Sequence, residues 1–149
     1  VVFLGQKHAQ RVALIRKLVR DLSIDVNLRV LPIVRERDGL AISAQNQLLS
    51  PAERQAATIL YQALLAGKAL IEKGERRPAV IEKAIAKLIA TEPLVKLDYA
   101  AICDPETFEH MGRKMAVNLS DLLITVAAQV GNTRQIDNIL WKREGYWLT

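Results

Sequence analysis

The spacing of apolar residues changes period twice between residues 1 and 31, and these changes predict a β-α-β unit. A short apolar run over residues 1–4 ends at Gly5, which is typical of a strand that runs into a turn. Beyond it, apolar residues recur at helical spacing and predict a helix over residues 8–22. Residues 26–31 then alternate with period two and predict a second strand that ends near Pro32.

The two strands of such a unit run parallel, so the segments that follow them leave the sheet at the same edge. These segments are residues 5–7 after the first strand and residues 34–46 after the second. Open α/β sheets bind ligands at this edge, and the start of helix 8–22 directs unpaired backbone N–H groups toward it. The pattern therefore predicts an anion site that includes Lys7.

The rest of the chain predicts a helical pair packed on a small antiparallel sheet. Ser50-Pro51-Ala52-Glu53 combines an N-cap serine, a proline at the first helical position and a capping-box glutamate. The helix that starts there continues to a stop at Gly74, and a second helix spans residues 78–91. Three β-rich pieces follow, over residues 94–103, 122–130 and 135–141, and the boundary between the two units is expected near residues 35–40.

Composition places the chain among globular proteins, since half of its 149 residues are apolar and a quarter are charged. No apolar stretch approaches the roughly 18–20 residues of a membrane helix, so no membrane association is expected. A single cysteine, Cys103, suits a reducing compartment, and we expect a cytoplasmic protein in which this residue is a small buried hydrophobe. The opening residues lack the features of a signal peptide.

The net charge of +5 lies in the first quarter of the chain, where residues 1–37 hold eight Lys or Arg against three acids. Such a patch attracts anions, although a solvated helix face is the simpler interpretation. Nucleic acid is not favoured, because this stretch has Phe3 as its one stacking residue and no module signature. His8, Cys103 and His110 are too widely separated to show metal-ligand spacing, so no metal site is predicted.

Several motifs, taken together, indicate a more specific function than an anion site at a sheet edge. They are Gly5-Gln6-Lys7-His8, residues 12–16, 32–46 and 49–54, residues 92–99, Asp104-Pro105-Glu106-Thr107, Gly131-Asn132-Thr133-Arg134 and Ile136-Asp137-Asn138. In this order and spacing they closely resemble the second half of the pantothenate synthetases, the pantoate–β-alanine ligases. The resemblance spans nearly the whole chain and ends at about Ile139.

The resemblance implies an α/β fold: the β-α-β tail of a Rossmann-like nucleotidyltransferase domain over residues 1–36, then a small α+β lid domain over residues 37–149. It implies an ATP-dependent ligase in which pantoate and ATP form pantoyl adenylate and pyrophosphate. The amine of β-alanine then displaces AMP to give pantothenate. ATP would enter as its Mg²⁺ complex, no tightly bound cofactor is implied, and a homo-oligomer, specifically a dimer, is expected.

Residue by residue, the resemblance assigns a small site. Lys7 matches the lysine that contacts phosphate, and it is the catalytic candidate. Gly5 matches a glycine near the ribose, and Val34 matches the position whose backbone meets the adenine. Ser43 matches the first serine of a Ser-Ser-Arg-Asn loop, so it is a candidate hydrogen-bond donor to the triphosphate.

Four positions in the same segments depart from the family pattern. His8 stands where the family usually has an aspartate in the ATP site, and it cannot hold ribose hydroxyls as a carboxylate does. Arg11 replaces the glutamine that orients pantoate. Ala44 and Gln45 replace the second serine and the arginine of the ATP-binding loop. Each lost charge-assisted contact would cost about 1.5–3 kcal/mol if it is made in the transition state, which predicts a weakened phosphate clamp.

The family's His-x-Gly-His segment and the first strands of its Rossmann domain have no counterpart in this sequence, so we expect the 149 residues alone to be inactive. Three interpretations are open. The chain is the carboxyl-terminal part of a pantothenate synthetase, a degenerate relative that serves as a nucleotide-binding or protein-interaction module, or an unrelated structural or nucleic-acid-binding domain. Half of a Rossmann sheet would leave one edge and one apolar face open, which predicts self-association.

Overall fold

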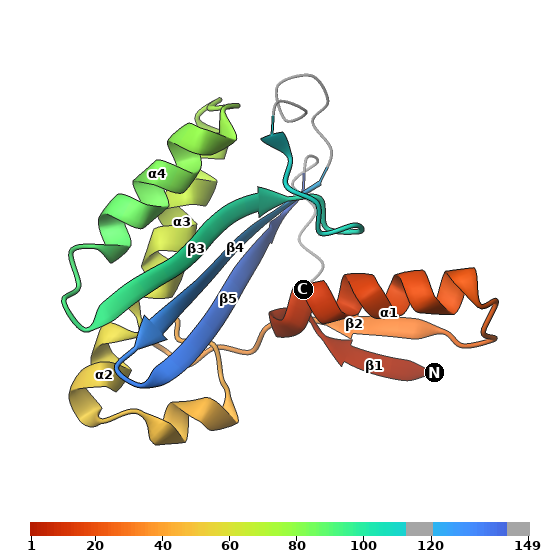
Figure 1. The fold of residues 1–149 in the computed structure, drawn as a ribbon, viewed down its shortest axis with the longest axis horizontal. Coiled ribbons are helices and arrows are strands. Elements are labelled where there is room, and N and C mark those ends of the chain that lie inside the picture. Colours follow the sequence, from red (N-terminus) through yellow and green to blue (C-terminus); the bar gives the residue numbers. More distant parts are fainter. Residues whose placement is uncertain (113–120, 143–149) are drawn as a thin grey trace.

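The computed structural model describes residues 1–112 and 121–142 and contains two units (Figure 1). The first unit is a small α/β layer and the second is a helical pair on an antiparallel sheet. In chain order the elements are β1 Val2–Gly5, η1 Gln6–His8, α1 Ala9–Asp21, β2 Leu28–Leu31, η2 Ala44–Leu48, α2 Pro51–Ala56, α3 Ile59–Glu72, α4 Pro78–Ile89, β3 Val95–Cys103, β4 Leu122–Val130 and β5 Thr133–Trp141, where η marks a short 3₁₀ helix. This architecture confirms the predicted fold class.

The first unit is the predicted β-α-β arrangement. Strands β1 and β2 pair in parallel, with Val2 opposite Leu28 and Gly5 opposite Leu31. Helix α1 covers them, but its buried residues are Val12 and Ala13, so little apolar surface is removed from water. Large apolar side chains of this unit are exposed on more than one side: Phe3 and Leu31 lie on one face of the two-stranded sheet, and Leu14 and Leu18 lie on a different side of α1 from the buried Val12. Val2, Leu22 and Ile24 are exposed as well.

The second unit holds the main hydrophobic core. Helices α3 and α4 cover one face of the sheet β3-β4-β5 (Figure 1). Each large aliphatic side chain that is fully removed from water there contributes about 1.5–3 kcal/mol. The largest fully buried side chains belong to Leu60, Leu64, Ile71, Ile81, Ile85, Ile89, Ile102, Leu122, Ile124, Val126 and Val130.

The sequence predicts one helix from Ser50 to Gly74, and this prediction is wrong because the helix is interrupted. Its start is as expected: the Glu53 N–H donates to the Ser50 hydroxyl, and the Ser50 N–H donates to the Glu53 carboxylate. The helix then breaks between α2 and α3 at residues 57–58. There the Thr58 hydroxyl donates to the Gln55 carbonyl at 2.8 Å, and the Thr58 N–H donates to the same carbonyl at 3.3 Å. This local competition tightens the turn without disturbing the apolar spacing.

The segment that leaves the sheet after β2 forms a tight hairpin over residues 34–42, and η2 follows it. The Ile42 N–H donates to the Val34 carbonyl, and the Glu36 N–H donates to the Leu40 carbonyl, both at 2.9 Å. Gly39 turns the chain with a φ of +92°, and a Cβ at this position would collide with the Tyr61 ring. The domain boundary predicted at residues 36 and 37 falls inside this hairpin and stays a prediction.

Candidate functional site

Lys7 lies in η1, the single turn that connects the carboxyl end of β1 to the start of α1. Its side chain is partly buried. Burial lowers the pKa of Lys7 from its ordinary value of 10.5, attraction to Asp137 opposes that shift, and repulsion from Arg35 adds to it. A bound phosphate would compensate this partly desolvated ammonium group.

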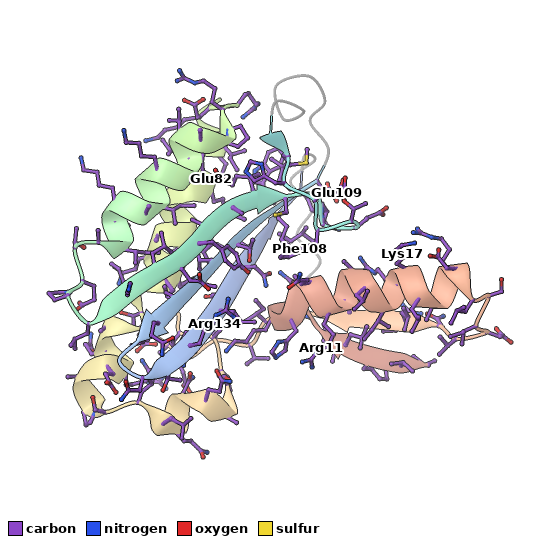
Figure 2. All side chains as sticks on the ribbon, in the orientation of Figure 1. Arg11, Lys17, Glu82, Phe108, Glu109 and Arg134 are labelled. Atoms are coloured by element: carbon purple, nitrogen blue, oxygen red, sulfur yellow. The ribbon has the colours of Figure 1, made fainter. Side chains whose placement is uncertain are left out.

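Two further basic residues, His8 and Arg11, stand at the start of α1. Figure 2 labels Arg11 at this end of the helix. His8 occupies the N-cap position, but its side chain makes no capping hydrogen bond, and residues 9–12 of the described helix include no acid. Burial lowers the pKa of His8 below 6.5, and the positive charges of Arg11 and Lys7 lower it further. The N–H groups and cations at this end of α1 form a favourable setting for an anion.

A buried ion pair joins the base of the hairpin to the sheet β3-β4-β5. The Arg35 guanidinium donates to both carboxylate oxygens of Asp137, at 2.7 and 2.9 Å, and their side chains are 16% and 4% exposed. Arg35 also donates to the carbonyls of Gly39 and Asn138, each at 3.1 Å. Its charged carbon lies 3.9 Å from the centre of the Tyr61 ring, so the guanidinium is stacked as well as paired.

Asn138, the next residue of β5, holds the Lys7 turn. Its Nδ2 donates to the carbonyls of Gln6 at 3.0 Å and of Lys7 at 3.2 Å. Its Oδ1 accepts from Gln6 Nε2 at 3.1 Å. The other short helix, η2, also lies against β5. Both η1 and η2 therefore border the same strand.

The expected nucleotide-binding residues fall into two groups. Gly5, Lys7, His8 and Arg11 lie together around the start of α1. The hairpin sets Val34 beside Ile42, immediately before Ser43-Ala44-Gln45. The Ser43 hydroxyl oxygen accepts the Gln45 N–H at 3.3 Å, so its proton remains available for donation to a ligand, while Ala44 and Gln45 are exposed. That the two groups meet on one set of phosphates stays a prediction.

A cleft of about 820 Å³ lies between the α/β unit and the second unit. Gln6, Arg35 and Asn138 reach it, whereas Lys7, His8, Arg11 and Ser43 are not among its lining residues. Three residues that hold the two predicted segments thus line the cleft, while these predicted contact residues do not. Other lining residues include Arg16, Arg29, Tyr61, Lys68, Glu72, Arg76 and Trp141.

The remaining chemistry-bearing residues lie at the far end of β3. Cys103 is buried as expected, and burial together with Glu82 and Asp104 raises the pKa of its thiol to about 11, which disfavours the reactive thiolate. His110 Nε2 lies 2.6 Å from Glu82 Oε1. Glu82, Phe108 and Glu109 lie at this end of the molecule, away from Arg11 (Figure 2). Within residues 1–112 and 121–142, no group of three His, Cys, Asp or Glu residues is placed to hold a metal ion.

Sequence reasoning missed the residues that organise the site, namely Gln6, Arg35, Tyr61, Asp137 and Asn138. Four of them stand inside the motifs that carry the family resemblance, which is the one signal that could have marked them. Tyr61 carries no such signal. Its role depends on a contact with Arg35 and Gly39 that only the folded chain creates.

A β-α-β unit with a basic turn after its first strand, joined to a helix-backed antiparallel sheet, defines an α/β protein suited to receive an anion at that edge. The family model described as pantoate-beta-alanine ligase matches residues 1–140. The chain therefore belongs to the pantoate–β-alanine ligase family, as its motifs indicate.

Individual relatives agree with this assignment. A pantothenate synthetase from Caldicellulosiruptor saccharolyticus is 46% identical over 138 residues, which cover 93% of this chain and 48% of the relative. The crystal structure of pantothenate synthetase from Thermus thermophilus matches with a TM-score of 0.84 and 34% identity, over 92% of this chain and 48% of that one.

A pantoate-beta-alanine ligase from Francisella tularensis, solved with beta-gamma ATP and beta-alanine, matches with a TM-score of 0.58 and 25% identity, over 93% of this chain and 42% of that one. The chain thus spans about half the length of the relatives it matches. In the described residues, no helix combines the length and apolar character needed to cross a membrane.

Replacing Asp137 by Asn should strongly destabilise the fold, because it leaves the buried Arg35 guanidinium without its counter-charge. We expect a loss of about 3–5 kcal/mol in the free energy of unfolding, measured by urea denaturation. Asp98→Asn is the matched control, since Asp98 forms an exposed ion pair with Arg134 of the same sheet and should matter little. Equal effects of the two substitutions would contradict the importance given to the buried pair.

Proposed function

We propose that the chain is the carboxyl-terminal part of an ATP-dependent ligase that joins pantoate and β-alanine. The observation that carries this proposal is the family match over residues 1–140, in which Lys7 follows the first strand of the β-α-β unit. The Francisella tularensis relative, solved with beta-gamma ATP and beta-alanine, supports the same substrates for this family member.

The proposed reaction has two steps and needs no protein nucleophile. The pantoate carboxylate attacks the α-phosphorus of ATP, and pyrophosphate leaves, which gives pantoyl adenylate. The amine of β-alanine then attacks the acyl carbon and loses a proton, and AMP leaves with the electrons of the broken acyl–oxygen bond. The protein therefore positions the substrates and neutralises the charge that builds up on the phosphate.

Lys7 is the proposed cation for that charge, and its partly buried position makes its interaction with phosphate stronger than it would be in water. Ser43 is the proposed donor to the triphosphate. Gly5 would lie near the ribose, and the Val34 backbone would meet the adenine. Mg²⁺ would arrive with ATP, bound by phosphate oxygens.

The substitutions at four positions change what this site can do. His8, Ala44 and Gln45 would still border ATP, but they offer neither a carboxylate for the ribose nor an arginine for the triphosphate. Arg11 would meet pantoate through its carboxylate, because a guanidinium has donors only. Neutralising the charge at the α-phosphate therefore depends on Lys7 more than the family pattern would require.

We also infer a cytoplasmic location, because a single cysteine suits a reducing compartment.

The Lys7 assignment predicts a specific loss of nucleotide affinity. Lys7→Ala should weaken ATP binding to the chain by about 10- to 100-fold in titration calorimetry, because a charged hydrogen bond to phosphate is lost. Lys17→Ala is the control, since Lys17 lies near the far end of α1 and pairs with Asp21. ATP binding that both variants leave unchanged would remove Lys7 from the site. ATP binding without AMP release by the intact protein, given pantoate and β-alanine, would instead identify a non-catalytic nucleotide-binding module.

The low pKa of His8 predicts a pH dependence with a definite sign. In the free protein the imidazole stays neutral to below pH 6.5, and a bound phosphate would stabilise its charged form and raise its pKa. The ratio of ATP affinities between the wild type and His8→Asn should therefore rise as the pH falls below about 6.5. Protonation of ATP itself cancels in this ratio. A ratio that stays flat with pH would place His8 away from the phosphates.

The exposed apolar side chains of the α/β unit predict that the isolated chain forms a dimer. Phe3, Leu14, Leu18 and Leu22 are between 50% and 66% exposed, which is an unfavourable arrangement for a monomer in water. Leu14→Lys combined with Leu18→Lys should shift the chain to monomer in sedimentation equilibrium. Leu48→Lys, at an exposed position of η2 outside the α/β unit, should have no effect. A wild-type chain that sediments as a monomer at every concentration would contradict the proposal.

A further inference from the structure

We propose that Asn138 is a positioning residue, which fixes the Lys7 turn in place relative to the Val34–Ser43 hairpin. The two segments proposed to bind the nucleotide are far apart in the sequence. In the structure they are attached to neighbouring residues of one strand, with Asn138 holding η1 and Asp137 holding Arg35 at the base of the hairpin.

The Asn138 side chain is built into this contact. The residue is 1% exposed, and both its carboxamide oxygen and its Nδ2 are bonded to Gln6 or Lys7. No isosteric replacement reproduces the set: an aspartate would keep an acceptor for Gln6 Nε2 but would place a carboxylate against two carbonyl oxygens. The full use of a buried amide indicates that this geometry is specified rather than incidental.

Apart from the hydrogen bonds of Asn138, little apolar packing fixes the η1 turn to the second unit. η1 is three residues long and contains no buried residue, so apolar packing contributes little to its position. Two of the three bonds end on main-chain carbonyls of Gln6 and Lys7, so they fix the backbone from which the Lys7 ammonium extends. Asn138 therefore acts on Lys7 without occupying the place of a ligand.

Asn138 and Asp137 face opposite sides of the sheet, so the strand joins two separate contacts. Asp137 lies opposite Val126, whose side chain belongs to the core beneath the helices, whereas Asn138 lies opposite Thr125 on the other row. The Asn138 carbonyl also accepts from Arg35, and its N–H donates to Asp137 Oδ1 at 2.8 Å. A continuous network of hydrogen bonds thus runs from the hairpin through β5 to Lys7.

Correct relative placement of such groups matters for binding and catalysis, because a displacement of about 1 Å can reduce activity on the order of a hundredfold. Asn138→Ala should therefore loosen Lys7 while leaving the core of the second unit in place. Arg134→Ala is the matched control, because Arg134 lies on the same strand and makes an exposed ion pair with Asp98.

The first experiment measures the titration of Lys7 and does not depend on ATP. Lysines of the folded chain are labelled by reductive ¹³C-methylation, and the Lys7 resonance is assigned with Lys7→Arg and followed with pH by NMR. In Asn138→Ala the released turn becomes more solvated, so the Lys7 pKa should rise toward 10.5, whereas Arg134→Ala should leave it unchanged. Gln6→Ala, which removes one of the three bonds, should give a smaller rise and serves if Asn138→Ala does not fold. A Lys7 pKa unchanged in the folded variant would overturn the proposal.

The second experiment is a double-mutant cycle on ATP affinity, and this part rests on the proposed function. Asn138→Ala should weaken ATP binding about tenfold in the wild-type background but have little effect in Lys7→Ala, because Asn138 acts through Lys7. Equal weakening in both backgrounds would show a general structural role and overturn the positioning role. A wild-type chain that binds no ATP would count against the proposed function, while the Lys7 titration would still decide the role of Asn138.

Discussion

The arrangement of the candidate site depends on the ion pair between Arg35 and Asp137. These residues are 102 positions apart, and their contact joins the segment that follows β2 to β5, the last strand of the antiparallel sheet. Tyr61 stacks on the guanidinium, and Gly39 leaves room for that ring. A pair this deeply buried adds little net stability compared with an apolar contact, but it is costly to break, since either charge left alone remains desolvated. The interaction therefore specifies one arrangement of hairpin and sheet more than it strengthens the fold.

The two units differ in how much apolar surface they bury, and this difference explains why polar contacts hold the site. Most of the large buried aliphatic side chains lie between α3, α4 and the sheet, whereas α1 buries only Val12 and Ala13. The α/β unit meets β5 through the amide of Asn138 rather than through a shared apolar core. Hydrogen bonds are directional and apolar contacts are not, so a small interface of this kind sets the orientation of the Lys7 turn more precisely than packing of similar size would.

The sequence predicts well what is encoded locally. Apolar periodicity located the β-α-β unit and the three strands of the sheet, and the capping box located the start of α2 at Ser50. The apolar pattern did not predict the break at Thr58, because a hydrogen bond from the Thr58 hydroxyl to a nearby carbonyl leaves that pattern intact. The contacts of Arg35 and Asn138 escaped for a different reason: their partners are distant in sequence, and neither charge nor spacing identifies them. The family resemblance named Lys7 and Ser43, but whether two such distant segments meet is decided by the tertiary arrangement, which no local pattern contains.

The departures from the family pattern change where positive charge lies within the proposed site. His8 is neutral at neutral pH, because burial and the nearby cations lower its pKa, so it supplies neither the carboxylate of the family pattern nor a positive charge. Ala44 and Gln45 add no charge on the loop side. Two cations, Lys7 and Arg11, then remain among the proposed contact residues, and both belong to the segment around η1. A site whose charge lies on one side tolerates displacement of that side poorly. Coulomb attraction falls with distance, and no cation among the proposed contact residues of the loop compensates. The hydrogen bonds of the Asn138 carboxamide therefore matter more in this chain than they would in a relative that retains the arginine of the loop.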